Sequence, residues 1–132
     1  MNKLTEKDVK NLIGAAKASL LNAYAPYSNF KVGAAILTDG GDIFSGCNVE
    51  NAAGSGICAE RTALYSAVAG GHNSFVAIAV ISDSDDFCTP CGTCRQALYE
   101  FSPEMNVYSC KKDGSYKEFI LKDLLPEAFK SN

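Results

Sequence analysis

Three cysteines and one glutamate stand at a spacing that suits metal chemistry. Cys91 and Cys94 open a predicted helix, and side chains at i and i+3 lie on the same side of a helical turn, where two thiolates can hold one ion. Cys58 opens a second predicted helix and offers a third sulfur, with Glu60 two positions later. Because residues i and i+2 lie about 200° apart around a helix, Cys58 and Glu60 cannot readily bind one ion together. The spacing therefore indicates different roles for the sulfurs and the carboxylate.

The chemistry of such a site follows from charge and coordination number. A helix N-terminus carries about half a positive charge and free N–H groups, both of which stabilise thiolates. Three thiolates on Zn²⁺ leave a fourth position open to water, which is typical of catalytic rather than structural zinc. A carboxylate such as Glu60, near that position but not a ligand, is suited to carry protons from the water to a substrate.

Five blocks of sequence occur in an order that is more specific than any one motif. They are 25–35 (APYSNFKVGAA), 46–52 (GCNVENA), 58–64 (CAERTAL), 90–96 (PCGTCRQ) and 124–129 (LLPEAF). Together they resemble the small members of the zinc-dependent cytidine deaminase family, which open one helix with Cys-Ala-Glu and the next with Pro-Cys-x-x-Cys. The similarity covers most of the chain.

The resemblance implies roles residue by residue. Cys58, Cys91 and Cys94 are implied to bind one Zn²⁺ per chain, Glu60 to transfer protons, and Arg61 to donate hydrogen bonds to ligand sulfurs. The implied reaction is the hydrolysis of cytidine and 2′-deoxycytidine to uridine and 2′-deoxyuridine plus ammonia, a step of pyrimidine salvage. Water attacks C4 of the cytosine ring while the glutamate protonates N3 and then the leaving amine.

The resemblance also implies how the nucleoside binds. Asn48 and Glu50 are implied to hydrogen-bond the ribose, Phe30 to lie beside the pyrimidine, and Phe129 to line the pocket of a neighbouring subunit in a homotetramer with shared active sites. Alternation along a strand independently places Asn48 and Glu50 on one face. One segment departs from the family, since 54–57 (GSGI) is shorter and lacks the usual aromatic residue. We expect this change to alter the contact between subunits.

Other interpretations of the same residues remain open. Cys91 and Cys94 alone also fit a thiol oxidoreductase or a structural zinc site in an interaction module, although the module has no use for Glu60. Cys88 extends the run toward an iron–sulfur pattern, but the downstream Cys-Pro is missing. Within the deaminases, a modified cytosine nucleoside such as a blasticidin-type antibiotic is an alternative substrate. Asn48 and Glu50 also fit ordinary polar residues that stabilise a strand end.

The elements that must position these residues are indicated by hydrophobic spacing. A capping box at Thr5 and Asp8 precedes apolar residues at helical spacing up to Pro26. Apolar runs predict strands at 30–37, 43–49, 75–81, 105–110 and 116–120, and further helices at 58–69, 92–101 and 122–125. This order predicts an α/β fold, a three-layer α/β/α sandwich around one mixed, about five-stranded sheet.

Composition narrows the class of protein. The 132 residues are enough for a single domain, 1–132. Twelve basic against 15 acidic residues give a formal charge of −3, which argues against nucleic acid as a partner and favours a small-molecule substrate. The sequence has neither a run of about 18 apolar residues nor the pattern of a signal peptide, so we expect no membrane partner and a cytoplasmic location.

Overall fold

The first helix, α1 (Glu6–Leu20), begins at a capping box in the computed structural model, which describes residues 4–130. The hydroxyl of Thr5 accepts a hydrogen bond from the backbone N–H of Asp8 at 3.1 Å, and the Asp8 carboxylate accepts one from the Thr5 N–H at 3.0 Å. The predicted capping box is therefore confirmed. The helix ends at Leu20, before the last apolar positions of the pattern, because Tyr24 pairs with the backbone of Asn48 and Glu50 instead.

One mixed sheet of five strands carries the fold. Its strands are β1 (Val32–Thr38), β2 (Ile43–Cys47), β3 (Phe75–Ser82), β4 (Asn106–Cys110) and β5 (Tyr116–Ile120), in the spatial order β2-β1-β3-β4-β5. The pair β3 and β4 is parallel, and the other neighbouring pairs are antiparallel. Every residue of β3 is buried, as its continuous apolar sequence predicts for a strand covered on both faces.

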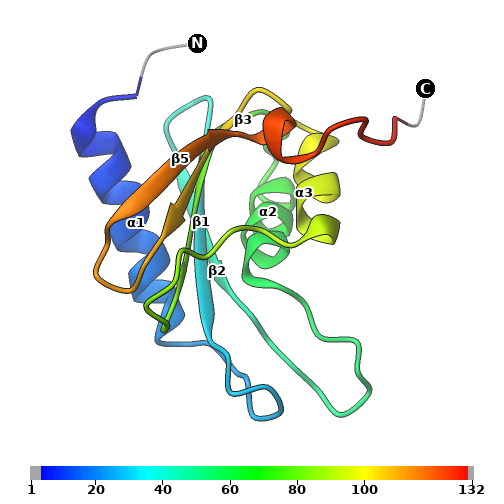
Figure 1. Ribbon diagram of the computed structural model, residues 1–132. Helices are drawn as coiled ribbons and strands as arrows, with labels where there is room; N and C mark the ends of the chain where they lie inside the picture. Colours follow the sequence, from blue (N-terminus) through cyan, green and yellow to red (C-terminus); the bar gives the residue numbers. More distant parts are fainter. Residues whose placement is uncertain (1–3, 131–132) are drawn as a thin grey trace.

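Helices cover both faces of the sheet. Figure 1 shows α1 on one side and the helices α2 (Ala59–Ala69) and α3 (Gly92–Tyr99) on the other. Two hydrophobic cores result, one under α1 and one under α2 and α3. The predicted three-layer α/β/α sandwich is confirmed. The expected last helix is a short 3₁₀ turn, η1 (Leu121–Leu124), which packs against α3.

Two glycines let the helices approach the sheet closely. A Cβ atom on Gly33 of β1 would lie 2.1 Å from the carbonyl oxygen of Ala16 in α1. A Cβ atom on Gly46 of β2 would lie 2.5 Å from the backbone nitrogen of Ala63 and 2.9 Å from the carbonyl oxygen of Ala59. Because all three distances to backbone atoms are too short for a Cβ atom, only glycine fits at these two positions. Gly46 thereby brings the end of β2 against the first turns of α2.

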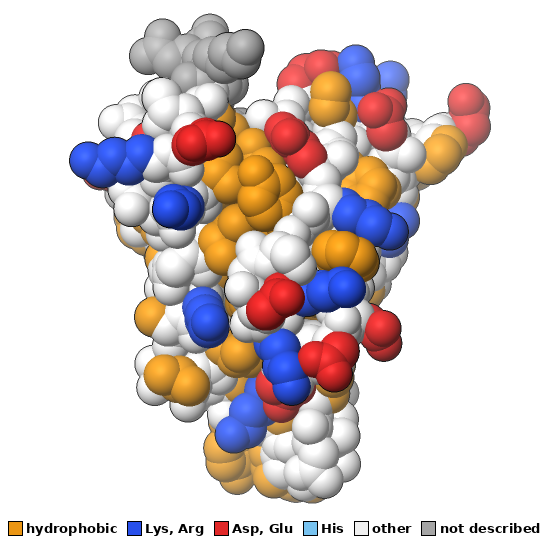
Figure 2. Space-filling view, turned by 60° about the vertical axis from the view of Figure 1, so that its left-hand side comes forward, with side chains coloured by type: hydrophobic (Ala, Val, Ile, Leu, Met, Phe, Trp, Pro, Cys, Tyr) orange, Lys and Arg blue, Asp and Glu red, His pale blue; other side chains and the backbone are white. Residues whose placement is uncertain are grey.

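The sheet is covered unevenly on the α1 side. Helix α1 packs on β1, β2 and β3, which leaves a cavity of about 470 Å³ between α1 and the turn before β5, lined in part by Val9, Ile13 and Tyr116. Figure 2 shows hydrophobic side chains gathered on this face, with lysine and acidic side chains around them. Among residues 4–130, no helix has the length and apolar character needed to cross a membrane.

Candidate metal centre and substrate site

The three cysteines singled out from the sequence lie together. The sulfur of Cys91 is 3.9 Å from that of Cys58 and 3.4 Å from that of Cys94, and all three sulfurs lie within 4.8 Å of one another. Sulfurs that bind one tetrahedral zinc ion at about 2.3 Å are roughly 3.8 Å apart. The cluster therefore has the size needed to hold one such ion. Cys94 is buried, Cys58 is half-buried and Cys91 is exposed, so the site can be reached from solvent.

Two helix N-termini position these sulfurs. Cys58 is the N-cap residue of α2, Cys91 is the N-cap residue of α3, and Cys94 lies one turn into α3. Neither N-cap side chain makes a capping hydrogen bond among the described residues. The positive ends of α2 and α3 thus lie at the sulfurs, which stabilises thiolates.

The thiols of α3 differ in their surroundings. Burial and the nearby charge of Glu60 raise the pKa of Cys94. Burial also acts to raise the pKa of Cys91, but hydrogen bonds with Cys94 and Cys58 outweigh it and hold that pKa below its ordinary value of 9.0. Of this pair, the more exposed Cys91 is therefore the thiol that loses its proton more readily.

Glu60 lies beside the cluster without joining it. The side chain is 4 % exposed, and the group of residues able to share a metal ion in the described part of the chain contains the three cysteines but not Glu60. Burial raises the pKa of its carboxyl above 4.5, while the backbone N–H groups of Glu60 and Cys91 and the thiol of Cys94 act to lower it. A carboxyl with a raised pKa, held against α3, can accept and return a proton.

Arg61 contacts the cluster from the next position of α2. One of its terminal nitrogens donates to the sulfur of Cys58 at 3.5 Å. Hydrogen bonds to the sulfurs of Cys58 and Cys94 raise the pKa of the guanidinium group, so it stays charged. Its Nε atom is buried and has no hydrogen-bond partner within residues 4–130. This geometry suits a residue that withdraws negative charge from sulfur ligands.

Cys88 stays outside the metal cluster. Burial, together with the charge of Glu60, raises the pKa of its thiol to about 12, and among the described residues the group able to share one ion contains Cys58, Cys91 and Cys94 but not Cys88. Its backbone N–H donates to the carbonyl oxygen of Cys110, and its side chain packs against the core under α2 and α3. The arrangement gives no support to an iron–sulfur site.

Asn48 and Glu50 hold the loop that precedes β1. The Asn48 amide accepts from the N–H of Val32 at 2.9 Å and donates to the carbonyl oxygen of Phe30 at 2.7 Å. One oxygen of the Glu50 carboxylate accepts from the N–H groups of Tyr27 and Ser28, at 3.0 and 3.1 Å. These bonds explain why β1 begins at Val32 rather than at Phe30, since side chains replace the strand partner there. The Phe30 side chain remains 46 % exposed.

Ser28 belongs to the same network, and our sequence analysis did not identify it. Its hydroxyl donates to the second oxygen of the Glu50 carboxylate at 2.5 Å and accepts from the N–H of Phe30 at 3.1 Å. The available signal was its place in the 25–35 block, two positions before Phe30. A serine in a polar loop is too common for that signal to stand out, because the partner carboxylate lies 22 positions away.

The C-terminal segment presents Phe129 outward. Gln96 of α3 donates to the carbonyl oxygen of Phe129 at 3.0 Å, and the Phe129 side chain is 73 % exposed. Arg95 donates to the carbonyl oxygens of Pro90 at 2.7 Å and Leu124 at 2.8 Å, and so connects this segment to the residue before Cys91. Neither Arg95 nor Gln96 was predicted as a site residue, although both follow Cys94 in the 90–96 block.

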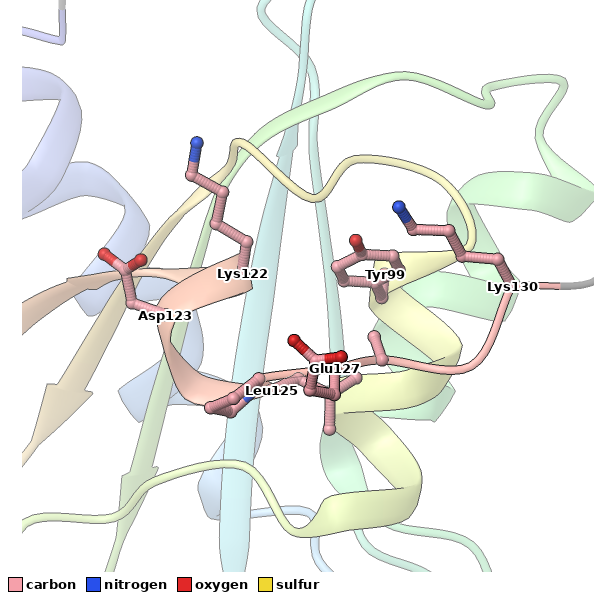
Figure 3. Close-up of a pocket in the computed structure, with 8 residues that line it drawn as sticks. Tyr99, Lys122, Asp123, Leu125, Glu127 and Lys130 are labelled. Carbon is pink, nitrogen blue, oxygen red and sulfur yellow. The ribbon is translucent and has the colours of Figure 1, made fainter.

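A cavity of about 650 Å³ borders the C-terminal segment. Tyr99, Lys122, Glu127 and Lys130 stand around it (Figure 3). None of the predicted site residues lines it: the lining consists of Tyr99, Lys122, Asp123, Leu125, Pro126, Glu127, Ala128 and Lys130. The residues with metal and proton chemistry are therefore elsewhere, at the N-termini of α2 and α3.

Backbone hydrogen bonds close the loop that contains residues 54–57. Val49 and Ile57 exchange two backbone hydrogen bonds, at 3.1 and 3.0 Å. Gly54 has a φ of +74°, which favours glycine, and a Cβ atom on Gly56 would lie 2.7 Å from the carbonyl oxygen of Val49. The loop leads directly from the Asn48 and Glu50 strand end into Cys58, so it connects the two halves of the site.

Comparison with known proteins gives the site its context. The model of the cytidine and deoxycytidylate deaminase zinc-binding region matches residues 6–110. The chain belongs to the cytidine and deoxycytidylate deaminase family. A cytidine deaminase from Sporosarcina psychrophila is 47 % identical over 124 residues, which are 92 % of this chain and 91 % of that protein.

Solved structures agree with this assignment. The 1.6 Å crystal structure of cytidine deaminase from Burkholderia pseudomallei superposes with a TM-score of 0.88 and 48 % sequence identity, covering 96 % of this chain and all of that one. The cytidine deaminase from Mycobacterium tuberculosis gives a TM-score of 0.81 at 36 % identity, covering 92 % of this chain and 96 % of that chain. The chain thus has the fold and the zinc-binding region of the family, and Cys58, Cys91 and Cys94 form the cluster able to hold the ion.

Proposed function

We propose that the chain catalyses the hydrolytic deamination of cytidine and 2′-deoxycytidine, giving uridine or 2′-deoxyuridine and ammonia. The observation that carries this proposal is the three-sulfur cluster at two helix N-termini with the buried Glu60 carboxyl beside it. The similarity to cytidine deaminases over most of the chain supports the same reaction.

The residues of the metal centre have two roles: three cysteines are metal ligands and one glutamate transfers protons. Cys58, Cys91 and Cys94 would hold a zinc ion, which would supply a Lewis acid able to activate water for attack on the ring carbon that bears the amino group. Glu60 takes a proton from the attacking water and gives it to N3 of the pyrimidine, and then takes the remaining proton of the new C4 hydroxyl and gives it to the amine, which leaves as ammonia. The burial that raises its pKa favours both transfers, because a carboxyl with a pKa closer to neutrality both accepts and donates readily.

The remaining predicted residues bind the nucleoside. Asn48 and Glu50 hydrogen-bond the sugar, chiefly its 3′-hydroxyl, and neither contact needs the 2′-hydroxyl, so both ribose and deoxyribose are accepted. The exposed ring of Phe30, on a loop fixed by Asn48, lies beside the pyrimidine. Arg61 neutralises part of the charge on the sulfurs.

The assembly follows from the exposed C-terminal aromatic residue. We propose a homotetramer in which Phe129 lines the pocket of a neighbouring subunit, because a ring that is 73 % exposed on an anchored segment is placed to contact another chain. We also propose that residues 1–132 act as one domain, in the cytoplasm, in pyrimidine salvage, without a nucleic acid or membrane partner. The net charge of −3 supports the absence of a nucleic acid partner.

The alternative functions have weaker support. A thiol oxidoreductase needs two cysteines that exchange electrons with a partner, whereas here a third sulfur and a guanidinium group share the cluster with Cys91 and Cys94. Deamination of a modified cytosine nucleoside is less favoured as the function, because the similar proteins are cytidine deaminases.

The deciding experiment compares Glu60→Gln with Glu100→Gln, a matched change of an exposed glutamate at the end of α3. Zinc content and the loss of cytidine absorbance are measured for both. We expect Glu60→Gln to lower kcat by about 10³-fold while about one zinc per chain is retained, and Glu100→Gln to match the parent protein. Full activity of Glu60→Gln would overturn the assignment of the proton carrier, and no turnover of cytidine by the zinc-loaded parent would overturn the proposed reaction.

A further inference from the structure

Between Tyr24 and Val32, the backbone is held at Tyr27, Ser28 and Phe30 by side chains. At Phe30 both backbone groups are bonded to side chains: the N–H donates to the Ser28 hydroxyl at 3.1 Å, and the carbonyl oxygen accepts from Asn48 at 2.7 Å. Asn29 between them has a φ of +58°, so the chain turns sharply at this point. The Ser28 hydroxyl closes that turn and reaches Glu50 at the same time.

The side chains of Asn48 and Glu50 keep some hydrogen-bonding groups that a ligand can use. The Asn48 amide has two N–H donors, and one of them is used by Phe30. One Glu50 oxygen already accepts two backbone N–H groups, and the other accepts the Ser28 hydroxyl. This leaves one donor on Asn48 and one acceptor position on the second Glu50 oxygen. A hydroxyl group both donates and accepts, so this pair is matched to one sugar hydroxyl.

We propose that Ser28 is a positioning residue that fixes the Glu50 carboxylate and the Phe30 backbone in one arrangement, and so sets the recognition of the sugar hydroxyl. This inference rests on the proposed function, because it requires Asn48 and Glu50 to contact the nucleoside sugar. Ser28 acts through Glu50 and Phe30 rather than by touching the reacting atoms.

The chemistry of the network explains why a hydroxyl is needed at position 28. Removal of the hydroxyl leaves the second Glu50 oxygen without its protein donor and the Phe30 N–H without its acceptor. The hydrogen bond from Ser28 also makes the largest contribution to the lowered pKa of Glu50. Glu50 is thus held as a carboxylate, which accepts hydrogen bonds but does not donate them. Threonine keeps the hydroxyl, whereas alanine removes both bonds.

The test compares two substrates in the zinc-loaded enzyme. Cytidine carries the 3′-hydroxyl and 3′-deoxycytidine lacks it, so the ratio of their kcat/KM values measures recognition of that hydroxyl alone. We expect Ser28→Ala to reduce this preference about tenfold, mainly through KM for cytidine, since a hydrogen bond to a charged group that loses its fixed geometry has an effect of this size. Ser28→Thr should restore most of the preference. An unchanged ratio in Ser28→Ala would overturn the proposal.

Ser115 offers a matched control. Its hydroxyl also donates to a carboxylate, that of Asp113 at 2.6 Å, in the turn before β5. Ser115→Ala removes the same kind of hydrogen bond and should leave the substrate ratio unchanged. A general loosening of the structure by lost serine–carboxylate bonds would move both variants alike, which would overturn the specific role of Ser28.

A Glu50→Gln variant separates failure of this inference from failure of the proposed function. Loss of the preference in Glu50→Gln but not in Ser28→Ala would overturn the role of Ser28 and leave the sugar contact in place. An unchanged preference in Glu50→Gln would overturn the sugar contact itself. If Ser28→Ala does not fold, Ser28→Cys, which has a similar size and a weaker donor, should show a smaller preference than Ser28→Thr; a preference equal to that of the parent protein would then overturn the proposal.

Discussion

The N-terminus of α1 and those of α2 and α3 use the same two helix positions for different purposes. In α1, Thr5 at the N-cap and Asp8 three positions later exchange hydrogen bonds. In α3 the same positions hold Cys91 and Cys94, whose sulfurs lie 3.4 Å apart. In α2 they hold Cys58 and Arg61, and the guanidinium group donates to the sulfur. All three pairs meet because residues i and i+3 are neighbours on a helix.

The difference shows how the fold separates stability from function. The first turn of α1 satisfies its own N–H groups, which stabilises the helix by about 1 kcal/mol. In the described chain, α2 and α3 begin without a side-chain cap, and the positive ends of their dipoles stabilise the thiolates instead. Binding of the metal offsets this loss of helix stability, since a metal that binds only the folded protein stabilises it.

The largest effect is expected from giving α3 the kind of cap that α1 has. Cys91→Ser places a preferred N-cap residue before Gly92 but removes a soft thiolate ligand. We expect zinc affinity to fall more than about 100-fold, beyond the effect of losing an outer partner of a ligand, and activity to fall with it. Zinc content after dialysis and the rate of cytidine loss are the measurements.

Cys47→Ser is the control for this substitution, because Cys47 is a half-buried thiol outside the cluster. It should retain zinc and activity. If Cys91→Ser kept its zinc and also gained about 1 kcal/mol in free energy of unfolding, as expected from a new N-cap, helix capping and metal binding at these positions would not exclude one another.

A smaller effect on zinc affinity is expected at the pair of Cys58 and Arg61. Zn²⁺ with three thiolates has a formal charge of −1, which Arg61 partly compensates at Cys58. We expect Arg61→Ala to weaken zinc retention about 10- to 100-fold, measured by competition with a chromophoric chelator. Arg61→Lys keeps the charge but loses the planar guanidinium group, so its zinc retention should lie between those of the parent protein and Arg61→Ala. Equal retention in all three proteins would contradict a role for Arg61 at the sulfurs.

What the sequence could predict depends on how local each contact is. The pairs Thr5 with Asp8 and Cys91 with Cys94 follow from helix geometry alone, and the burial of β3 follows from its apolar run. The meeting of Cys58 with Cys91 does not, because it joins two helices 33 residues apart. The resemblance to a family indicated that contact, and close packing at Gly46 helps to achieve it.

The contacts that sequence analysis missed are polar and distant. Ser28 bonds Glu50 across 22 positions, and Arg95 bonds the carbonyl oxygen of Leu124 across 29. Neither residue breaks a local pattern, since a serine fits any turn and an arginine fits any helix surface. The first strand also starts at Val32, later than its apolar run predicted, because the Asn48 and Ser28 side chains take the hydrogen bonds of Phe30.

The cap of α1 should affect stability without affecting the site. Thr5→Ala removes the hydroxyl that accepts from Asp8, and we expect the free energy of unfolding to fall by about 1 kcal/mol. Zinc content and kcat should match those of the parent protein, because α1 covers the opposite face of the sheet from α2 and α3, whose N-termini carry the cysteines (Figure 1). Urea unfolding of the zinc-loaded proteins measures the first effect. A fall in zinc content would show that the N-termini are not independent.

The smallest effect concerns the pH dependence of the same cap. The Thr5 N–H bonded to Asp8 lowers the pKa of that carboxyl below 3.8. A group whose pKa is lower in the folded state stabilises the fold above its unfolded pKa, and this contribution disappears as the pH falls through the folded pKa. The stability difference between the parent protein and Asp8→Ala should therefore be constant near neutral pH and shrink once the pH falls below about 3.8. Both proteins lose zinc binding alike in acid, so the difference isolates the cap. A difference that persists undiminished at the lowest pH would mean that Asp8 acts through helix packing rather than through its charge.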